Sequence, residues 1–197
     1  MKQITSTLST TATFSDDGVK RLCLEKLWDA QKPNLAIVML APSTASSVSL
    51  DSTTQLCLNN ADRLGYGSVT ILNLFATLND FGLKQAEDEE PENLDAIIRA
   101  AERATTIIYA AGTGKIKNKL FLARQAQVIS ALAPFADKLY CLCAADGSCR
   151  LQHPLSPSVR EWHLSKLDPN ELIPDLAEPQ TAEQKKKGKP KVPAKKE

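Results

Sequence analysis

Several features that would assign the chain to a specialised class are missing from its sequence. The 197 residues include no run of about 18 apolar residues, and the first residues lack the charged, apolar and small-residue order of a signal peptide. No C-x-x-C pair occurs among the five cysteines, so the usual spacing of a zinc or iron–sulfur site is absent. We therefore expect a soluble, cytoplasmic protein with buried free thiols and with no metal or cofactor.

Histidine is scarce, and the glycines and serines lack the spacing of two common catalytic motifs. With only His153 and His163, a metal site built from several imidazoles is disfavoured. The glycine turn at residues 110–115 lacks the G-x-x-x-x-G-K-[ST] spacing of a nucleotide-hydrolysing loop. Neither Ser43 nor Ser156 lies in the G-x-S-x-G elbow of a serine hydrolase. The sequence therefore disfavours all three of these enzyme classes.

What the sequence does contain is 43% hydrophobic residues, enough for one domain with a substantial core. The near-neutral total charge hides an asymmetry, because residues 181–197 hold seven lysines and two glutamates and carry +5, which leaves −4 on the rest. We expect a monomeric protein with a single domain over residues 1–167. Over residues 168–197 we expect a disordered basic tail that attracts DNA phosphates, the alternative being a solvated tail without a partner.

Strand and helix patterns alternate along the chain, after an N-terminal hairpin that turns at residues 14–19. The predicted strands span residues 35–40, 69–75, 106–111 and 138–143. The predicted helices span residues 51–65, 93–104, 118–133 and 158–167. This alternation predicts an α/β fold, a three-layer α/β/α sandwich around a mostly parallel sheet. Ligands of such folds bind beyond the carboxyl ends of the strands.

Two polar side chains are candidates for ligand contact at those ends. Asn73 follows apolar residues of a predicted strand, and its amide offers a donor and an acceptor that suit the edge of a base. His153 precedes a proline in a loop after the last predicted strand, where a rigid turn can aim the ring into a cleft. The alternative for Asn73 is a structural amide that holds a neighbouring loop. His163, next to Trp162 in a predicted helix, fits a structural histidine.

Four stretches, taken in order, resemble the uracil-DNA glycosylase superfamily. They are residues 40–43 (LAPS), 71–77 (ILNLFAT), 107–112 (IIYAAG) and 153–157 (HPLSP). More closely, the chain resembles the domain-of-unknown-function family 1643, with its L-N-P-S-T-A turn and its D-x-T, G-Y-G, N-L-F and H-P-L patterns. The corresponding positions are residues 40–45, 51–53, 65–67, 73–75 and 153–155.

The resemblance implies a glycosylase-like fold and a DNA glycosylase that flips out a base and hydrolyses its N-glycosidic bond. Carried over by position, Asn73 would hydrogen-bond the base, and His153 would stabilise negative charge on the departing base. Phe75 would stack on the base, and Leu155 would wedge into the DNA. The remaining pocket residues implied by the resemblance are Ala41, Pro42, Ser43, Thr44 and Ser156.

Three positions depart from the superfamily pattern. Ala41 stands where many members carry a polar residue that positions water, so Asp51 becomes the candidate to activate water, with helix capping as its alternative role. Ser43 stands where the uracil-specific branch has tyrosine, so we expect a roomier pocket for a modified pyrimidine, in repair or in defence against phage. The loop at residues 153–157 reads H-P-L-S-P, whereas the superfamily reads H-P-S-P-L.

Two other functions stay open on the sequence. One is a non-catalytic module that binds a nucleobase or nucleotide on the same scaffold. The other is an N-ribosyl hydrolase or transferase that acts on free nucleotides. The basic tail favours a polymeric substrate, whereas the acidic body gives no support to a broad DNA-binding face.

Overall fold

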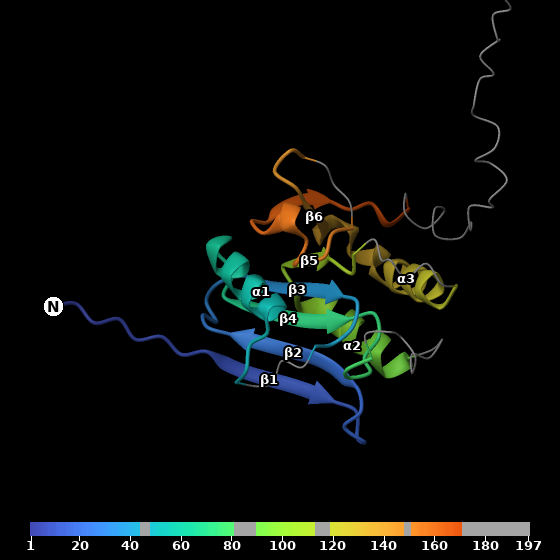
Figure 1. Cartoon of the computed structure of the whole chain (residues 1–197), viewed down its shortest axis with the longest axis horizontal. Helices are drawn as coiled ribbons and strands as arrows, with labels where there is room; N and C mark the ends of the chain where they lie inside the picture. The colour runs from blue at the N-terminus through green and yellow to red at the C-terminus, as the bar shows by residue number, and fades with distance from the viewer. Residues whose placement is uncertain (44–47, 81–89, 113–118, 148–150, 171–197) are drawn as a thin grey trace, which may run out of the picture.

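The computed structural model describes residues 1–43, 48–80, 90–112, 119–147 and 151–170. Within these residues, seven strands form one sheet in the order β1-β2-β4-β3-β5-β6-β7 (Figure 1). The strands are β1 (Ser9–Phe14), β2 (Arg21–Leu27), β3 (Asn34–Met39), β4 (Ser68–Asn73), β5 (Thr106–Tyr109), β6 (Leu139–Cys143) and β7 (His163–Lys166). The helices are α1 (Ser52–Arg63), α2 (Pro91–Arg103) and α3 (Lys119–Leu132), with 3₁₀ helices η1 (Ala133–Lys138) and η2 (Pro157–Val159).

Four parallel strands form the centre of the sheet. β4 pairs with β3, β3 with β5, and β5 with β6, all in parallel. The antiparallel hairpin β1–β2 extends the sheet beyond β4, and β7 runs antiparallel to β6 at the other edge. The carboxyl ends of the four central strands therefore lie together at one end of the sheet. This arrangement confirms the predicted α/β class and the N-terminal hairpin.

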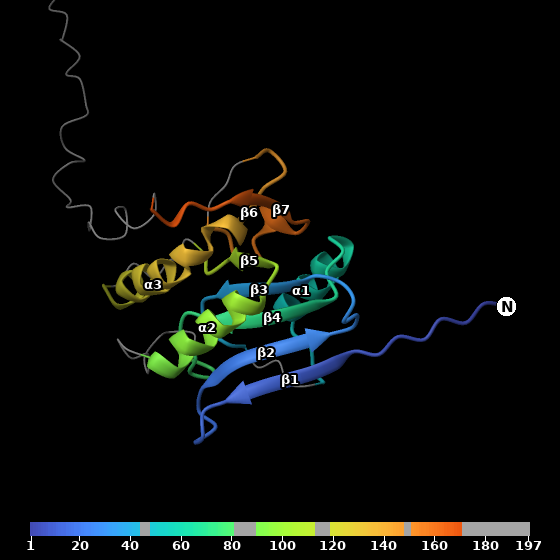
Figure 2. The same cartoon turned by 180° about the vertical axis from the view of Figure 1, so that it is seen from behind.

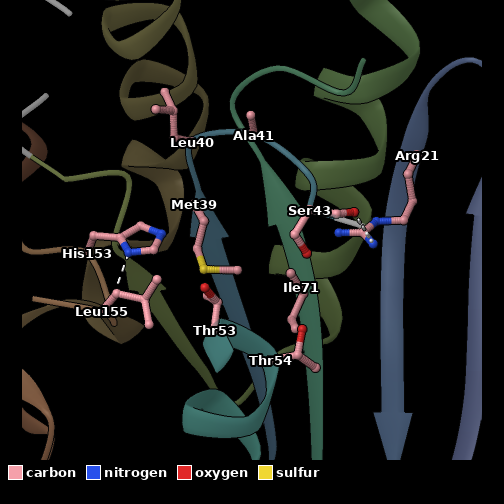
Figure 3. Close-up of a pocket in the computed structure, with 10 residues that line it drawn as sticks. All are labelled: Arg21, Met39, Leu40, Ala41, Ser43, Thr53, Thr54, Ile71, His153 and Leu155. Atoms are coloured by element: carbon pink, nitrogen blue, oxygen red, sulfur yellow. Dashed lines mark hydrogen bonds between the residues drawn. The ribbon is translucent and has the colours of Figure 1, made fainter. Parts of the chain in front are cut away.

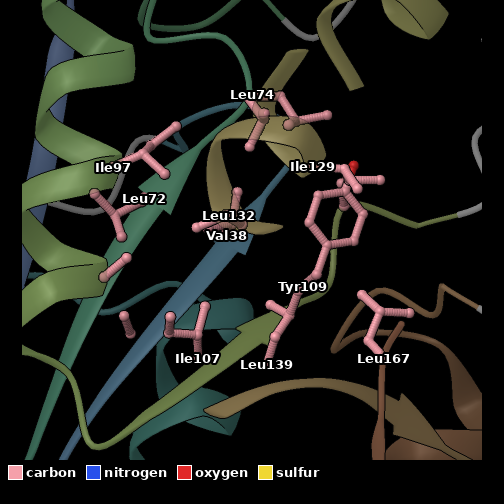
Figure 4. Close-up of a cluster of buried hydrophobic side chains, with 14 of the residues drawn as sticks. Val38, Leu72, Leu74, Ile97, Ile107, Tyr109, Ile129, Leu132, Leu139 and Leu167 are labelled. Atoms are coloured by element: carbon pink, nitrogen blue, oxygen red, sulfur yellow. The ribbon is translucent and has the colours of Figure 1, made fainter. Parts of the chain in front are cut away.

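The central strands are apolar on both faces, so helices can cover the sheet on either side. In β3, Ala36 and Val38 pack in a cluster with α2 and α3, while Leu35 and Ile37 pack against α1. Figure 4 shows part of the first cluster, and Figures 1 and 2 show α1 on one side of the sheet and α2 and α3 on the other. Full burial of each large aliphatic side chain contributes about 1.5–3 kcal/mol, which favours this packing strongly.

Helix α1 begins and ends as its sequence predicts. Asp51 is the N-cap, and its carboxylate accepts a hydrogen bond from the backbone N–H of Thr54 (2.7 Å). After the helix, Gly65 adopts a positive φ of 85°, and its N–H donates to the carbonyl of Asp62 (2.9 Å). These contacts define the two ends of α1.

Gly67 lies where no side chain fits. A Cβ atom on Gly67 would lie 1.9 Å from the carbonyl oxygen of Asp29. The Gly67 carbonyl accepts from the N–H groups of Trp28 (2.9 Å) and Asp29 (3.0 Å), and its own N–H donates to the Pro33 carbonyl (2.8 Å). The G-Y-G sequence between α1 and β4 thus combines the helix stop at Gly65 with a close backbone approach at Gly67.

The helix predicted over residues 158–167 is wrong. Instead, η2 is followed by β7, which pairs antiparallel with β6 from Tyr140 to Cys143. Trp162 is buried in the cluster beside α1, and the next residue, His163, is exposed. A strand at this position gives the edge of β6 backbone hydrogen-bond partners, which a helix would not supply.

The expectation of free thiols holds for three of the described cysteines, Cys23, Cys57 and Cys141. It is wrong for Cys143, which is disulfide-bonded. Cys143 ends β6, and the chain then reverses in a turn where the Gly147 N–H donates to the Ala144 carbonyl (2.9 Å).

Two predicted segments fall largely outside the described residues. The basic tail is one, from residue 171 onward. The glycine turn is the other, from residue 113 onward, although Gly112 is described and has a positive φ of 84°. Among the helices that the structure describes, none has both the length and the apolar character needed to cross a membrane.

Candidate functional site

A pocket of about 230 Å³ lies at the carboxyl ends of β3 and β4, where the fold class predicts a ligand. This volume is below the roughly 300–1,000 Å³ of pockets for drug-sized ligands, so it suits a single small ring. The lining residues are Arg21, Met39, Leu40, Ala41, Ser43, Thr53, Thr54, Ile71, His153 and Leu155 (Figure 3).

Segments from distant parts of the sequence meet at this pocket. Arg21 comes from the start of β2, Met39 ends β3, and His153 comes from the loop after β6. In Figure 3, His153 and Arg21 lie on opposite sides of the pocket, with Met39 and Ile71 between them. An apolar floor with a few polar groups at its margins is typical of a small-molecule site.

The His153 ring is oriented by its own loop. Its Nδ1 accepts a hydrogen bond from the backbone N–H of Leu155 (3.2 Å), and its carbonyl accepts from the N–H of Ser156 (2.8 Å). Burial lowers the pKa of His153 below its ordinary value of 6.5, although the nearby Asp51 charge acts in the opposite direction. A neutral ring that accepts at Nδ1 carries its proton on Nε2. His153 therefore supplies an Nε2–H donor at the pocket.

Helix α1 holds the segment that follows His153. The Asn60 side chain donates to the Arg160 carbonyl (3.0 Å) and accepts from the N–H of Trp162 (3.0 Å). Arg63 donates to the Trp162 carbonyl (2.9 Å). Because α1 also contributes Thr53 and Thr54 to the pocket, these bonds fix residues 160–162 relative to the pocket wall.

Arg21 is a pocket residue that the sequence interpretation missed. Its side chain is covered, with 3% of the residue exposed, and Nη1 donates to the Ser43 carbonyl (3.4 Å). Burial lowers the pKa of Arg21, and the charge of Asp51 opposes this effect. A guanidinium stays protonated in proteins, so Arg21 brings positive charge and N–H donors to the pocket. A single arginine at the start of a strand gives no sequence signal of such a role.

Asp51 lies beside the pocket and does not line it. Burial by itself raises the pKa of Asp51, but hydrogen bonds from Ser43 and Thr54 and the charge of Arg21 outweigh it and hold the pKa below its ordinary value. The carboxylate is therefore ionised and engaged at the helix cap. Capping, the alternative role for Asp51, is confirmed, and water activation stays a prediction.

Asn73 and Phe75 are placed outside the pocket lining. Asn73 ends β4 with 1% of the residue exposed, and its Nδ2 has no hydrogen-bond partner among the described residues. It pairs in register with Met39, which lines the pocket, so it is a neighbour of the site. Phe75 is buried in the hydrophobic cluster beside α2 and α3, so its ring is a core residue rather than a surface for stacking a ligand.

The other predicted residues divide into three groups. Ala41, Ser43 and Leu155 line the pocket. Pro42 is buried behind the turn, and Ser156 closes the His153 loop without lining the pocket. Thr44 lies outside the described residues.

A buried polar network holds the end of β4 from the face opposite α1. Asn93 in α2 donates to the carbonyls of Asn73 (3.0 Å) and Leu74 (3.1 Å). Arg124 in α3 donates from Nε to the Leu74 carbonyl (2.8 Å) and lies close to Glu90, whose charge acts on it. The strand end beside the pocket is thus fixed by hydrogen bonds from both α2 and α3.

The fold and the pocket define a mixed α/β protein with a small ligand site at the carboxyl ends of its parallel strands. No three His, Cys, Asp or Glu side chains gather in the described part of the chain as a metal site would require. Residues 21–155 match the family described as "Protein of unknown function (DUF1643)". The match covers well over half of the 197 residues, so the chain belongs to this family. No curated protein and no solved structure matches the chain.

The first and last residues that line the pocket are also the first and last residues of the family match. The match begins at Arg21 and ends at Leu155, and both of these residues line the pocket. Every other lining residue lies between them. The family region therefore contains the whole lining of the site.

Proposed function

We propose that the pocket binds an extruded nucleobase and that the protein hydrolyses its N-glycosidic bond, as a DNA glycosylase-like enzyme. The observation that carries the proposal is the presence of two N–H donors, from Arg21 and from His153 Nε2, around one small apolar pocket. The resemblance of residues 40–43 and 153–157 to the uracil-DNA glycosylase superfamily supports the same reaction.

The two donors suit the charge that develops in this reaction. Hydrolysis breaks the bond between the sugar carbon and the base nitrogen, and the electron pair of that bond leaves with the base. Water adds to the sugar carbon and gives up a proton to the base or to solvent. Donors fixed against the base oxygens stabilise the departing anion, and each such preorganised donor is worth about 10²–10³ in rate.

The small side chains at the turn after β3 support a modified pyrimidine as the substrate. Ser43 lines the pocket where the uracil-specific branch has tyrosine, and the neighbouring Ala41, which also lines it, is small. A pyrimidine with a substituent at C5 therefore fits this proposal better than plain uracil.

A second candidate is a module that binds a nucleobase without cleaving its bond. Two observations favour it. Ala41 has no group that can position water, and the Asp51 carboxylate is already engaged by Ser43 and Thr54. In this case Arg21 and His153 would read the base oxygens and no abasic site would form.

The experiment incubates the full-length protein with DNA that contains uracil or a C5-substituted pyrimidine, in single and double strands, and measures abasic sites by alkaline cleavage. His153→Ala should lower abasic-site formation about 10²–10³-fold, as expected for a lost donor. The matched control is His163→Ala, because His163 is exposed on β7 and outside the pocket. Binding without abasic sites would favour the second candidate. Equal losses in both variants would contradict a role for the His153 donor.

A further inference from the structure

A second pocket lies between the turn of the β1–β2 hairpin and the start of α2. Its volume is about 370 Å³, and it shares no lining residue with the candidate site. The lining residues are Ser15, Asp16, Asp17, Lys20, Glu90, Pro91, Glu92 and Asn93. Nothing in the proposed glycosylase reaction uses this pocket.

The charge of the second pocket is negative. Four of its lining residues carry carboxylates and one is a lysine, and the nearby Arg124 opposes the charge of Glu90, so the group carries a formal charge of −2. The amino terminus of α2 contributes the equivalent of about +0.5, which does not offset the carboxylates. The pocket therefore attracts a cation.

Two oxygen atoms in the wall of this pocket lack donors. Glu90, with 2% of the residue exposed, accepts at Oε2 from the Ala76 N–H (2.9 Å) and from the Asn93 side chain (3.2 Å). Its Oε1 is buried without a partner among the described residues. The same holds for Oδ1 of Asn93, a residue with 1% exposed. Buried polar atoms are nearly always hydrogen-bonded, so these two oxygens point to an absent donor.

The missing hydrogen-bond donor fits an ammonium group better than a metal ion. The described residues bring no three carboxylate, thiolate or imidazole groups close enough to hold a metal. A primary ammonium group carries three N–H donors and a full charge. An ammonium group therefore has enough donors for both Glu90 Oε1 and Asn93 Oδ1, with a third left for a rim carboxylate or solvent.

We propose that the pocket beside the start of α2 is a binding site for a primary ammonium group. Two sources can supply that group. One is a free polyamine. The other is the chain itself, because residues 181–197 contain seven lysines. Fully extended, residues 171–197 reach about 3.3 Å per residue, enough to cross a domain of this size.

The test titrates spermidine into the full-length protein by calorimetry at constant ionic strength, with Mg²⁺ as a second probe. Glu90→Gln should abolish spermidine binding, and a melting curve checks that this variant folds. The double variant Asp16→Asn/Glu92→Gln keeps the buried network and should weaken binding about tenfold, since it removes two rim charges. The matched control Asp62→Asn/Glu102→Gln removes two exposed carboxylates outside the pocket and should bind like the wild type.

Spermidine binding is then compared between the wild type and a variant in which glutamine replaces the seven tail lysines. This comparison distinguishes the two sources of the ammonium group. If the tail occupies the pocket, spermidine binds this chain and not the wild type. If the ligand is external, spermidine binds both chains with similar affinity. The rim variant and its control are compared in the chain that binds spermidine. Equal binding by these two variants, tighter binding of Mg²⁺ than of spermidine, or no spermidine binding by either chain would overturn the proposal.

Discussion

The two pockets border the end of β4 with opposite chemistry. On the α1 side, Arg21 and His153 present N–H donors over an apolar floor. On the α2 side, Glu90 and Asn93 present acceptor oxygens within an acidic rim. The strand end between them is held by Asn93 and Arg124. The first pocket therefore suits a ligand that gains negative charge, whereas the second suits a cation.

The largest expected effect comes from removing the buried cation of the first pocket. Arg21→Met should lower abasic-site formation about 10²–10³-fold, because it removes donors to the base and leaves Asp51 without its counter-charge. Arg103→Met, an exposed arginine at the end of α2, is the control with the same chemical change. Unchanged activity in Arg21→Met would show that the first pocket does not depend on its donors.

The next largest expected effect is a loss of stability when the buried polar network between the two pockets is disrupted. Asn93→Ala removes donors to the buried carbonyls of Asn73 and Leu74, so the free energy of unfolding should fall by about 2–4 kcal/mol. Asn59→Ala on the exposed face of α1 is the matched control and should change it by less than about 0.5 kcal/mol. Urea denaturation measures both. Equal effects would mean that the strand end needs no support from α2.

Two substitutions at Asp51 distinguish its role as the helix N-cap from a catalytic role of its negative charge. Asp51→Ala should lower the free energy of unfolding by about 0.5–2 kcal/mol because the N-cap hydrogen bond to Thr54 is lost. Asp51→Asn keeps a good capping residue and should keep most of that stability. Rates of abasic-site formation then test water activation. A large loss of rate in Asp51→Asn at unchanged stability would assign Asp51 the role of a base.

The smallest effect concerns the pH dependence of the His153 loop. Since burial lowers the pKa of His153, its neutral form stabilises the fold fully above about pH 6.5, and this contribution is lost as the pH falls through the lower folded-state pKa. Protonation at Nδ1 also ends the hydrogen bond from the Leu155 N–H. Melting temperatures of the wild type should therefore fall more steeply below pH 6.5 than those of His153→Gln. Parallel curves would contradict this.

The elements that could be predicted from the sequence are those fixed by local signals. Apolar runs mark the four central strands, and Asp51 and Gly65 mark the ends of α1. β7 could not be predicted, because the pairing of residues 163–166 with β6 is a long-range contact that overrides the local pattern. His153 could also be predicted as a pocket residue, because the sequence shows both the end of a strand and a proline turn next to it. The structure places His153 in the pocket lining.

The rest of the site depends on contacts that no local pattern contains. Arg21 reaches the pocket because the hairpin lies next to β4 in the sheet, and its sequence neighbourhood resembles any exposed strand. Phe75 fits an aromatic stacking motif in the sequence, yet just after the end of β4 it packs in the cluster covered by α2 and α3. Which face a side chain takes at a strand end is decided by register and not by residue type.

The stabilisation of a departing base anion in the first pocket is tested by measuring how the rate of base release depends on the acidity of the leaving base. A series of C5-substituted uracils in DNA is assayed in single turnovers with the wild type, His153→Ala and the control His163→Ala. If the pocket stabilises the departing anion, the rate should vary weakly with base pKa in the wild type and in the control, and steeply in His153→Ala. The same dependence in all three proteins, or no base release by the wild type, would contradict the proposed reaction.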